Sequence, residues 1–154
     1  MPLVEDLHHM TFLTGDMDRL VGFYERVFDA RVTLDRVDNG RRHAFIEIGP
    51  HTVLHPFEVA ADQVPDGQPM FQRGRLDHFA LNATSREAFL EIRRRLIAEG
   101  AHATEDGLVT DMRSMWSVSF HDPDGAWHEV MWAKPGVPLE ETTPPEEWEM
   151  IDPD

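Results

Sequence analysis

The chain contains no cysteine, and this absence limits the chemistry it can carry. Disulfides and thiolate–metal bonds are excluded, so any metal would be held by nitrogen and oxygen ligands. No apolar run approaches the ~20 residues that span a bilayer. The first residues, Met-Pro-Leu-Val-Glu-Asp, lack the basic start of a secretory signal. We therefore expect a cytoplasmic protein.

Basic residues are also scarce, with 14 Lys and Arg against 29 Asp and Glu, for a net charge of −15. This balance argues against nucleic acid or an anionic membrane surface as a partner. Residues 135–154 hold seven of the acidic residues, none of the basic ones and five prolines. We interpret them as an acidic, Pro-rich, extended tail, most simply a solvated one, that Trp148 and Met150 could attach to the body.

The body, residues 1–134, has the length and composition of one globular domain. Within it, the stretch 75–82 repeats the pattern of residues 7–13. When His78 is placed on His9, each histidine is followed by alternating apolar residues, which indicates a strand buried on one face with the histidine on the other. The chain is therefore predicted to be a duplicated unit with a histidine at the head of each half.

Each half predicts a strand, a helix and then three strands. Asp16 and the run 84–87 are suitable N-caps for the two helices, and Asn39-Gly40 predicts a tight hairpin. Residues 60–74, rich in Pro and Gly, form the predicted linker. We expect an α+β fold of two βαβββ modules, 6–59 and 75–133. The predicted strands are 7–14, 30–37, 42–48, 52–59, 76–82, 101–104, 114–121 and 126–133, and the predicted helices are 17–28 and 86–99.

Strand alternation places His9, His78 and Glu129 on faces opposite the helices, where they could meet in a cleft. Two imidazoles and one carboxylate form a facial set of metal ligands that leaves coordination positions open. A buried carboxylate also needs a partner. The alternative is a cluster of hydrogen-bonded histidines in a metal-free protein. We interpret four other histidines as surface or turn residues: His8, His51, His102 and His128.

The repeated His-headed strands and the element Asp122-Pro-Asp-Gly125-x-x-x-Glu129 resemble the vicinal oxygen chelate superfamily. That group includes glyoxalase I, extradiol dioxygenases, and fosfomycin and bleomycin resistance proteins. The segment 23–28 also resembles the family's helix, and the resemblance covers about residues 6–133. It implies a cupped pseudo-barrel of paired βαβββ modules around one divalent ion, with His9, His78 and Glu129 as the ligands.

The resemblance implies that the metal chelates two adjacent oxygens of a small-molecule substrate and acts as a Lewis acid. Three ligands suit an extradiol dioxygenase with Fe²⁺, the ion we favour, although Mn²⁺, Ni²⁺, Zn²⁺ or Mg²⁺ is possible. His55 matches either the acid–base histidine of those enzymes or a fourth ligand of glyoxalases. Pro56 indicates an edge strand, which favours the acid–base role. The predicted substrate pocket is lined by Thr11, Phe45, Trp116, Trp127 and Met131.

Two alternatives remain open at this stage. A glyoxalase I-type lyase, isomerase or epimerase would use His55 as a ligand. A metal-independent, bleomycin resistance-like protein would bind a drug in the same cup, although such members often lack the triad. Against ring cleavage, the tyrosine usual in extradiol enzymes is missing, because the sole tyrosine, Tyr24, lies on a predicted helix. On the resemblance alone we also expect a homodimer.

Overall fold

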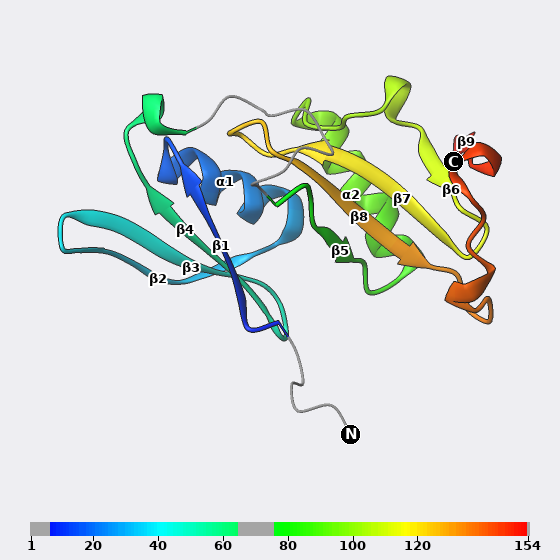
Figure 1. The fold of residues 1–154 in the computed structure, drawn as a ribbon, viewed down its shortest axis with the longest axis horizontal. Coiled ribbons are helices and arrows are strands. Elements are labelled where there is room, and N and C mark those ends of the chain that lie inside the picture. Colours follow the sequence, from blue (N-terminus) through cyan, green and yellow to red (C-terminus); the bar gives the residue numbers. More distant parts are fainter. Residues whose placement is uncertain (1–6, 65–75, 154) are drawn as a thin grey trace. The chain divides into compact units, whose positions relative to one another are not determined.

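The computed structural model describes residues 7–64 and 76–153. Contacts within the chain divide it into two units, residues 1–66 and 67–154. Each unit consists of one sheet and one long helix (Figure 1). Within the described ranges, no helix has the length and apolar character needed to cross a membrane. The predicted linker 60–74 includes a short 3-10 helix at Ala61–Gln63, and its residues 65–74 lie outside the described residues.

Unit 1 has a four-stranded sheet in the order β1-β4-β3-β2, with β1 parallel to β4 and the other neighbours antiparallel. One face of β3 and β4 packs against the helix. The buried core lies between them and includes Leu20, Tyr24, Ala44, Ile46 and Leu54. The elements are β1 (His9–Thr14), α1 (Met17–Phe28), β2 (Arg31–Asp38), β3 (Arg41–Gly49) and β4 (Thr52–Glu58).

Unit 2 has a five-stranded sheet in the order β5-β8-β7-β6-β9, and its helix packs against β8. Its core includes Phe89, Leu96, Val118, Phe120 and Val130. Ser85 caps the helix by accepting a hydrogen bond from the Ala88 N–H. The elements are β5 (Ala80–Asn82), α2 (Arg86–Ala98), β6 (Val109–Asp111), β7 (Met115–His121), β8 (Trp127–Ala133) and β9 (Glu149–Ile151).

The two units repeat one topology, which confirms the predicted α+β fold and its βαβββ repeat. The order β1-β4-β3-β2 recurs as β5-β8-β7-β6, and β5 runs parallel to β8 as β1 does to β4. The alternation of faces is confirmed as well, because Val130 is buried while Glu129 beside it is not. The predicted hairpin at residues 38–41 is present, with positive φ at Asn39 and Gly40.

Three details of the strand assignment are wrong. The predicted strand 76–82 is confined to β5, Ala80–Asn82, so His78 lies before it. Residues 101–104 form only an isolated bridge, His102 to Phe120, and the strand of this region is β6. The predicted edge position of β4 is also wrong, because β4 lies between β1 and β3. Pro56 lacks one donor, which removes a single ladder bond worth about 1 kcal/mol. The β3–β4 pairs run on either side of it, His43 with Phe57 and Ile46 with Leu54.

The simpler interpretation of the tail as a solvated appendage is wrong for its last residues. Its strand β9 pairs antiparallel with β6, with Met150 opposite Thr110, and forms the outer strand of the sheet (Figure 1). Trp148 donates its indole N–H to the Thr143 carbonyl, a contact within the tail. The strand covers an edge of β6 that would otherwise offer free backbone groups.

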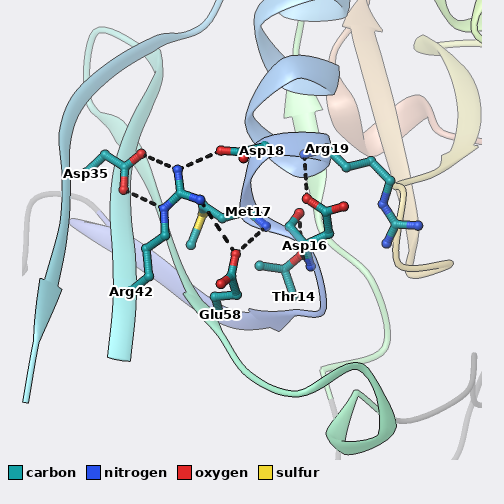
Figure 2. Close-up of polar contacts among 8 residues, drawn as sticks. All are labelled: Thr14, Asp16, Met17, Asp18, Arg19, Asp35, Arg42 and Glu58. Carbon is teal, nitrogen blue, oxygen red and sulfur yellow. Dashed lines mark hydrogen bonds and ion pairs between the residues drawn. The ribbon is translucent and has the colours of Figure 1, made fainter. Parts of the chain in front are cut away.

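A network around Arg42 attaches the β2–β3 hairpin to the start of α1 (Figure 2). The guanidinium donates two bonds to Asp35, of 2.9 and 2.7 Å, and one of 2.7 Å to Asp18. Glu58 lies 3.7 Å from the same guanidinium and accepts a 2.8 Å bond from the Met17 N–H. Because these contacts link three strands to the first turn of the helix, they fix how α1 sits on the sheet of unit 1.

Candidate functional site

His78 and Glu129 lie together in unit 2. His78 precedes β5 and Glu129 lies on β8, with His78 Nε2 3.7 Å from Glu129 Oε2. The other ring nitrogen, His78 Nδ1, is 2.8 Å from Asp77 Oδ1. The Ser117 hydroxyl on β7 donates to Glu129 Oε1 over 3.2 Å. Each of the two predicted ligands is therefore oriented by a second side chain.

This pair fits the requirements of a divalent metal. Because a carboxylate only accepts hydrogen bonds, Asp77 takes the Nδ1–H of a neutral His78 and leaves a lone pair on Nε2. Two nitrogen and oxygen ligands at ~2.1 Å from one ion lie roughly 3.0–3.5 Å apart, close to the observed separation. Ligating histidines usually donate the N–H of their second ring nitrogen to a carboxylate or carbonyl, and Asp77 is placed to accept such a bond from His78.

His9 and His55 lie together in unit 1. His9 begins β1 and its side chain is exposed. Its Nδ1 is 2.8 Å from Nδ1 of His8, so its Nε2 is the nitrogen left for a ligand. The His9 and His55 rings meet edge to face, with centroids 5.5 Å apart. Burial, followed by the charges of His43 and His9, lowers the pKa of His55, in the direction predicted for a desolvated imidazole.

His55 is also the end of a hydrogen-bonded chain that the sequence analysis missed. Its Nε2 is 2.9 Å from His43 Nδ1, and His43 Nε2 is 2.9 Å from Asp38 Oδ2. The sequence did contain a signal, because His43 and Phe45 are two residues apart in one strand and therefore share a face. Without a register between β3 and β4, parity could not show that this face brings His43 to His55.

The strand registers make these two pairs structural counterparts. Thr11 on β1 pairs with His55, and Ala80 on β5 pairs with Glu129. Thr11 lies two residues after His9, and Ala80 lies two residues after His78, so the His9–His55 pair of unit 1 corresponds to the His78–Glu129 pair of unit 2.

The correspondence extends to the side chains behind these pairs. His43 faces Phe57 across β3–β4, and Ser117 faces Met131 across β7–β8. His43 and Ser117 each bond the residue two positions before their cross-strand partner. The duplication therefore preserves a supporting contact as well as the strand order.

In the part of the chain that the structure describes, no group of three or more His, Asp or Glu side chains forms a metal-binding cluster. Each unit carries an incomplete set: His9 and His55 in unit 1, and His78 and Glu129 in unit 2. The predicted ligand triad takes one residue from the first unit and two from the second.

Four of the five predicted pocket residues share a face with the site residues of their own unit. Thr11 lies beside His55 in the β1–β4 register, and the Phe45 and His55 ring centroids are 4.5 Å apart. Trp127 and Met131 alternate with buried residues on β8, as Glu129 does. Within each unit, these positions suit a lining beside that unit's own site residues.

Trp116 does not share the face of Glu129, because it lies on the helix face of unit 2. It packs near Phe89 of α2 and donates its indole N–H to Asp111 over 3.0 Å. The Arg86 and Lys134 cations lie over its ring, 5.2 and 5.8 Å from the centroid. Trp116 is thus part of the packing between sheet and helix, and we leave it out of the pocket.

His128 also differs from its interpretation as a surface residue. It is 6% exposed and stacks on Phe79, with ring centroids 3.8 Å apart. Its Nε2 is 3.4 Å from Asp122 Oδ2. As strand parity predicts, His128 faces away from Glu129, and that direction leads into the core beneath α2.

Comparison with known proteins agrees with this duplicated fold. A glyoxylase/bleomycin resistance protein/dioxygenase domain from Frankia sp. EAN1pec has a TM-score of 0.72 at 17% identity, covering 85% of this chain and 99% of its own. The fosfomycin resistance protein FosX of Listeria monocytogenes has a TM-score of 0.66 at 19% identity, over 90% and 98% of the two chains. These two likenesses show a common fold.

FosX from Mesorhizobium loti is 25% identical over 83% of this chain and 91% of its own, with a TM-score of 0.55. No curated protein matches. The model of the Glyoxalase/Bleomycin resistance protein/Dioxygenase superfamily matches residues 6–130. The chain is a member of the Glyoxalase/Bleomycin resistance protein/Dioxygenase superfamily.

Proposed function

We propose that this protein is an enzyme that depends on one divalent metal ion, held by His9, His78 and Glu129. The observation that carries the proposal is the His78–Glu129 pair, in which Asp77 orients His78 and Ser117 orients Glu129. An ion-binding role also explains why a carboxylate on β8 and an imidazole just before β5 are held 3.7 Å apart. When bound, the ion would supply Lewis-acid stabilisation of negative charge on two adjacent substrate oxygens.

His55 is proposed as the acid–base residue, with the substrate lying against Thr11, Phe45, Trp127 and Met131. Its Nε2 is already engaged by His43, which argues against its use as a fourth ligand through that atom. The lowered pKa keeps the imidazole neutral near pH 7, the form that a base requires. The acid–base role therefore rests on this hydrogen bond and this pKa, and not on an edge position, since β4 is an inner strand.

Extradiol-type ring cleavage of a catechol with Fe²⁺ is the first reaction to test, because three ligands and a separate base are the set that such an enzyme needs. A second candidate is Mn²⁺-dependent chemistry on a small oxygenated phosphonate. It is favoured because a mutant of the Listeria FosX, 20% identical to this chain, is complexed with Mn(II) and 1S,2S-dihydroxypropylphosphonic acid.

The test begins with calorimetric titration of the purified protein with Fe²⁺ under anaerobic conditions and with Mn²⁺. We expect one ion per chain and loss of binding in His9→Gln, His78→Gln and Glu129→Gln. His51→Gln, an exposed turn residue, is the matched control for the histidines. Glu25→Gln, exposed on α1, is the control for the glutamate. Unchanged affinity in the ligand variants would exclude this site, and no binding to the wild-type protein would favour metal-independent drug binding.

Activity then separates the reactions. The iron-loaded protein is assayed with catechols in air for a coloured ring-cleavage product, and the manganese-loaded protein with fosfomycin for opening of the epoxide. We expect His55→Ala to retain the metal and lose turnover. If His55→Ala loses the metal as fully as His78→Gln, His55 is a ligand and a glyoxalase-type lyase or isomerase becomes the better assignment.

We also propose a homodimer that works in the cytoplasm on a small molecule. The assembly rests on the superfamily resemblance. Light scattering at micromolar concentration should give twice the chain mass of 17.7 kDa. A mass equal to one chain would exclude the dimer.

A further inference from the structure

The hydrogen-bonded chain Asp38–His43–His55 crosses the sheet of unit 1 on the face opposite α1. Asp38 ends β2, His43 lies on β3 and His55 on β4, so three neighbouring strands contribute one group each. His43 is 8% exposed, and its ring stacks on Phe57 with centroids 5.1 Å apart and planes 10° from parallel. Stacking and two hydrogen bonds together hold the His43 ring in one orientation.

The direction of the hydrogen bonds follows from Asp38. The bond with His43, opposed by partial desolvation and assisted by Arg36, lowers the pKa of the Asp38 carboxyl, which is ionised at neutral pH. A carboxylate only accepts, so a His43 ring with a single proton carries it on Nε2. Its Nδ1 is then an acceptor, and the 2.9 Å contact requires His55 to donate from its own Nε2.

We propose that Asp38 and His43 are positioning residues that fix His55 in the Nε2–H tautomer, so that Nδ1 carries its only lone pair. The use of that lone pair as a base rests on the proposed function, whereas the tautomer itself does not. The arrangement follows the general rule that the partner of one imidazole nitrogen sets the state of the other.

Unit 2 supports the assignment through the same positions of the fold. Ser117 is the counterpart of His43, and it bonds Glu129 as His43 bonds His55. In one unit the supporting hydroxyl suits a carboxylate, which only accepts. In unit 1, the acceptor nitrogen of His43 suits the His55 imidazole, which donates. The supporting residue thus matches the group it holds.

The tautomer can be measured without substrate or metal. Long-range ¹H–¹⁵N spectra of protein labelled with ¹⁵N-histidine distinguish the two neutral tautomers by nitrogen chemical shift. Signals are assigned with His55→Gln and His43→Asn. We expect His55 in the wild-type protein, near pH 8, to show one protonated Nε2 and one bare Nδ1. A protonated Nδ1 on neutral His55 would overturn the proposal.

Three variants test the role of Asp38 and His43 in fixing the tautomer. His43→Phe keeps a ring against Phe57 but removes the acceptor, so His55 should become a mixture of tautomers. His43→Asn places an amide oxygen near the former Nδ1 and should restore the Nε2–H form. Asp38→Ala, at an exposed position, should also mix the tautomers and serves as the test if His43→Phe fails to fold. An unchanged His55 tautomer in Asp38→Ala would refute the role of the pair.

The outcomes separate this inference from the proposed function. A wild-type Nε2–H tautomer in a protein that binds no metal would leave the inference standing and exclude the metalloenzyme. Metal binding together with a protonated Nδ1 on His55 would support the metalloenzyme and refute the proposed tautomer. Where turnover is found, His43→Phe should lower kcat about 10-fold or more with little change in KM, and His43→Asn should recover most of the loss.

Discussion

The bond from Ser117 to Glu129 offers the sharpest test of how the sheet prepares the proposed metal ligand. Ser117→Ala removes one hydroxyl from a position that is 1% exposed, with almost no change in shape. The hydroxyl donates to Glu129 Oε1 over 3.2 Å, longer than the roughly 2.5–3.0 Å usual for O–H···O bonds. The variant therefore removes orientation from the carboxylate without removing the carboxylate itself.

The burial and the bond length give the expected losses of stability and of metal affinity in Ser117→Ala. Loss of one hydrogen bond lowers the free energy of unfolding by about 1 kcal/mol. Glu129 keeps a 20% exposed side chain, so water can replace the hydroxyl and the loss should fall below that figure. Side chains that orient metal ligands typically change metal affinity ~10- to 100-fold, and the long bond places this variant near 10-fold.

The assay measures Mn²⁺ affinity by competition with a chelating dye, and stability by thermal unfolding of the metal-free protein. Ser114→Ala is a matched control, because that hydroxyl is also fully buried and bonds Thr142 over 2.6 Å. Both variants should lose some stability, and only Ser117→Ala should bind metal more weakly. Equal affinity in the two variants would show that Ser117 does not orient a ligand.

Three further predictions concern stability. Arg42→Met should lower the free energy of unfolding at pH 7 by about 1 kcal/mol. The bond to Arg42 lowers the pKa of Asp35, so this contribution is present above the pKa of Asp35 in the unfolded chain and is lost as pH falls through its pKa in the folded protein. Acid-unfolding curves of the wild type and the variant should therefore converge at low pH. Deleting residues 149–154 should uncover the edge of β6, lowering the melting temperature and raising the scattering mass; an unchanged monodisperse protein would contradict the role of β9. His128→Ala should cost about 2 kcal/mol in urea unfolding because the ring is buried, and a neutral result would mean that its stack on Phe79 contributes nothing.

The sequence by itself determined most of the elements and their faces. Alternation around His9 and His78 identified two equivalent strands, and the α1 boundaries follow from Asp16 and the apolar spacing. Asn39-Gly40 specified the hairpin because few other residues tolerate positive φ at both positions. These signals are local, so each could be interpreted without knowing any partner.

Tertiary structure decided which strands are neighbours and what each side chain meets. Pro56 predicts an edge because a missing donor is a local property, yet β4 gains partners on both sides from distant segments. Parity showed that His128 and Glu129 face opposite ways, but only packing showed that the face of His128 is buried. The Asp38–His43–His55 chain needs the registers of three strands at once. Register depends on how whole strands pair, and no short stretch of the sequence specifies it.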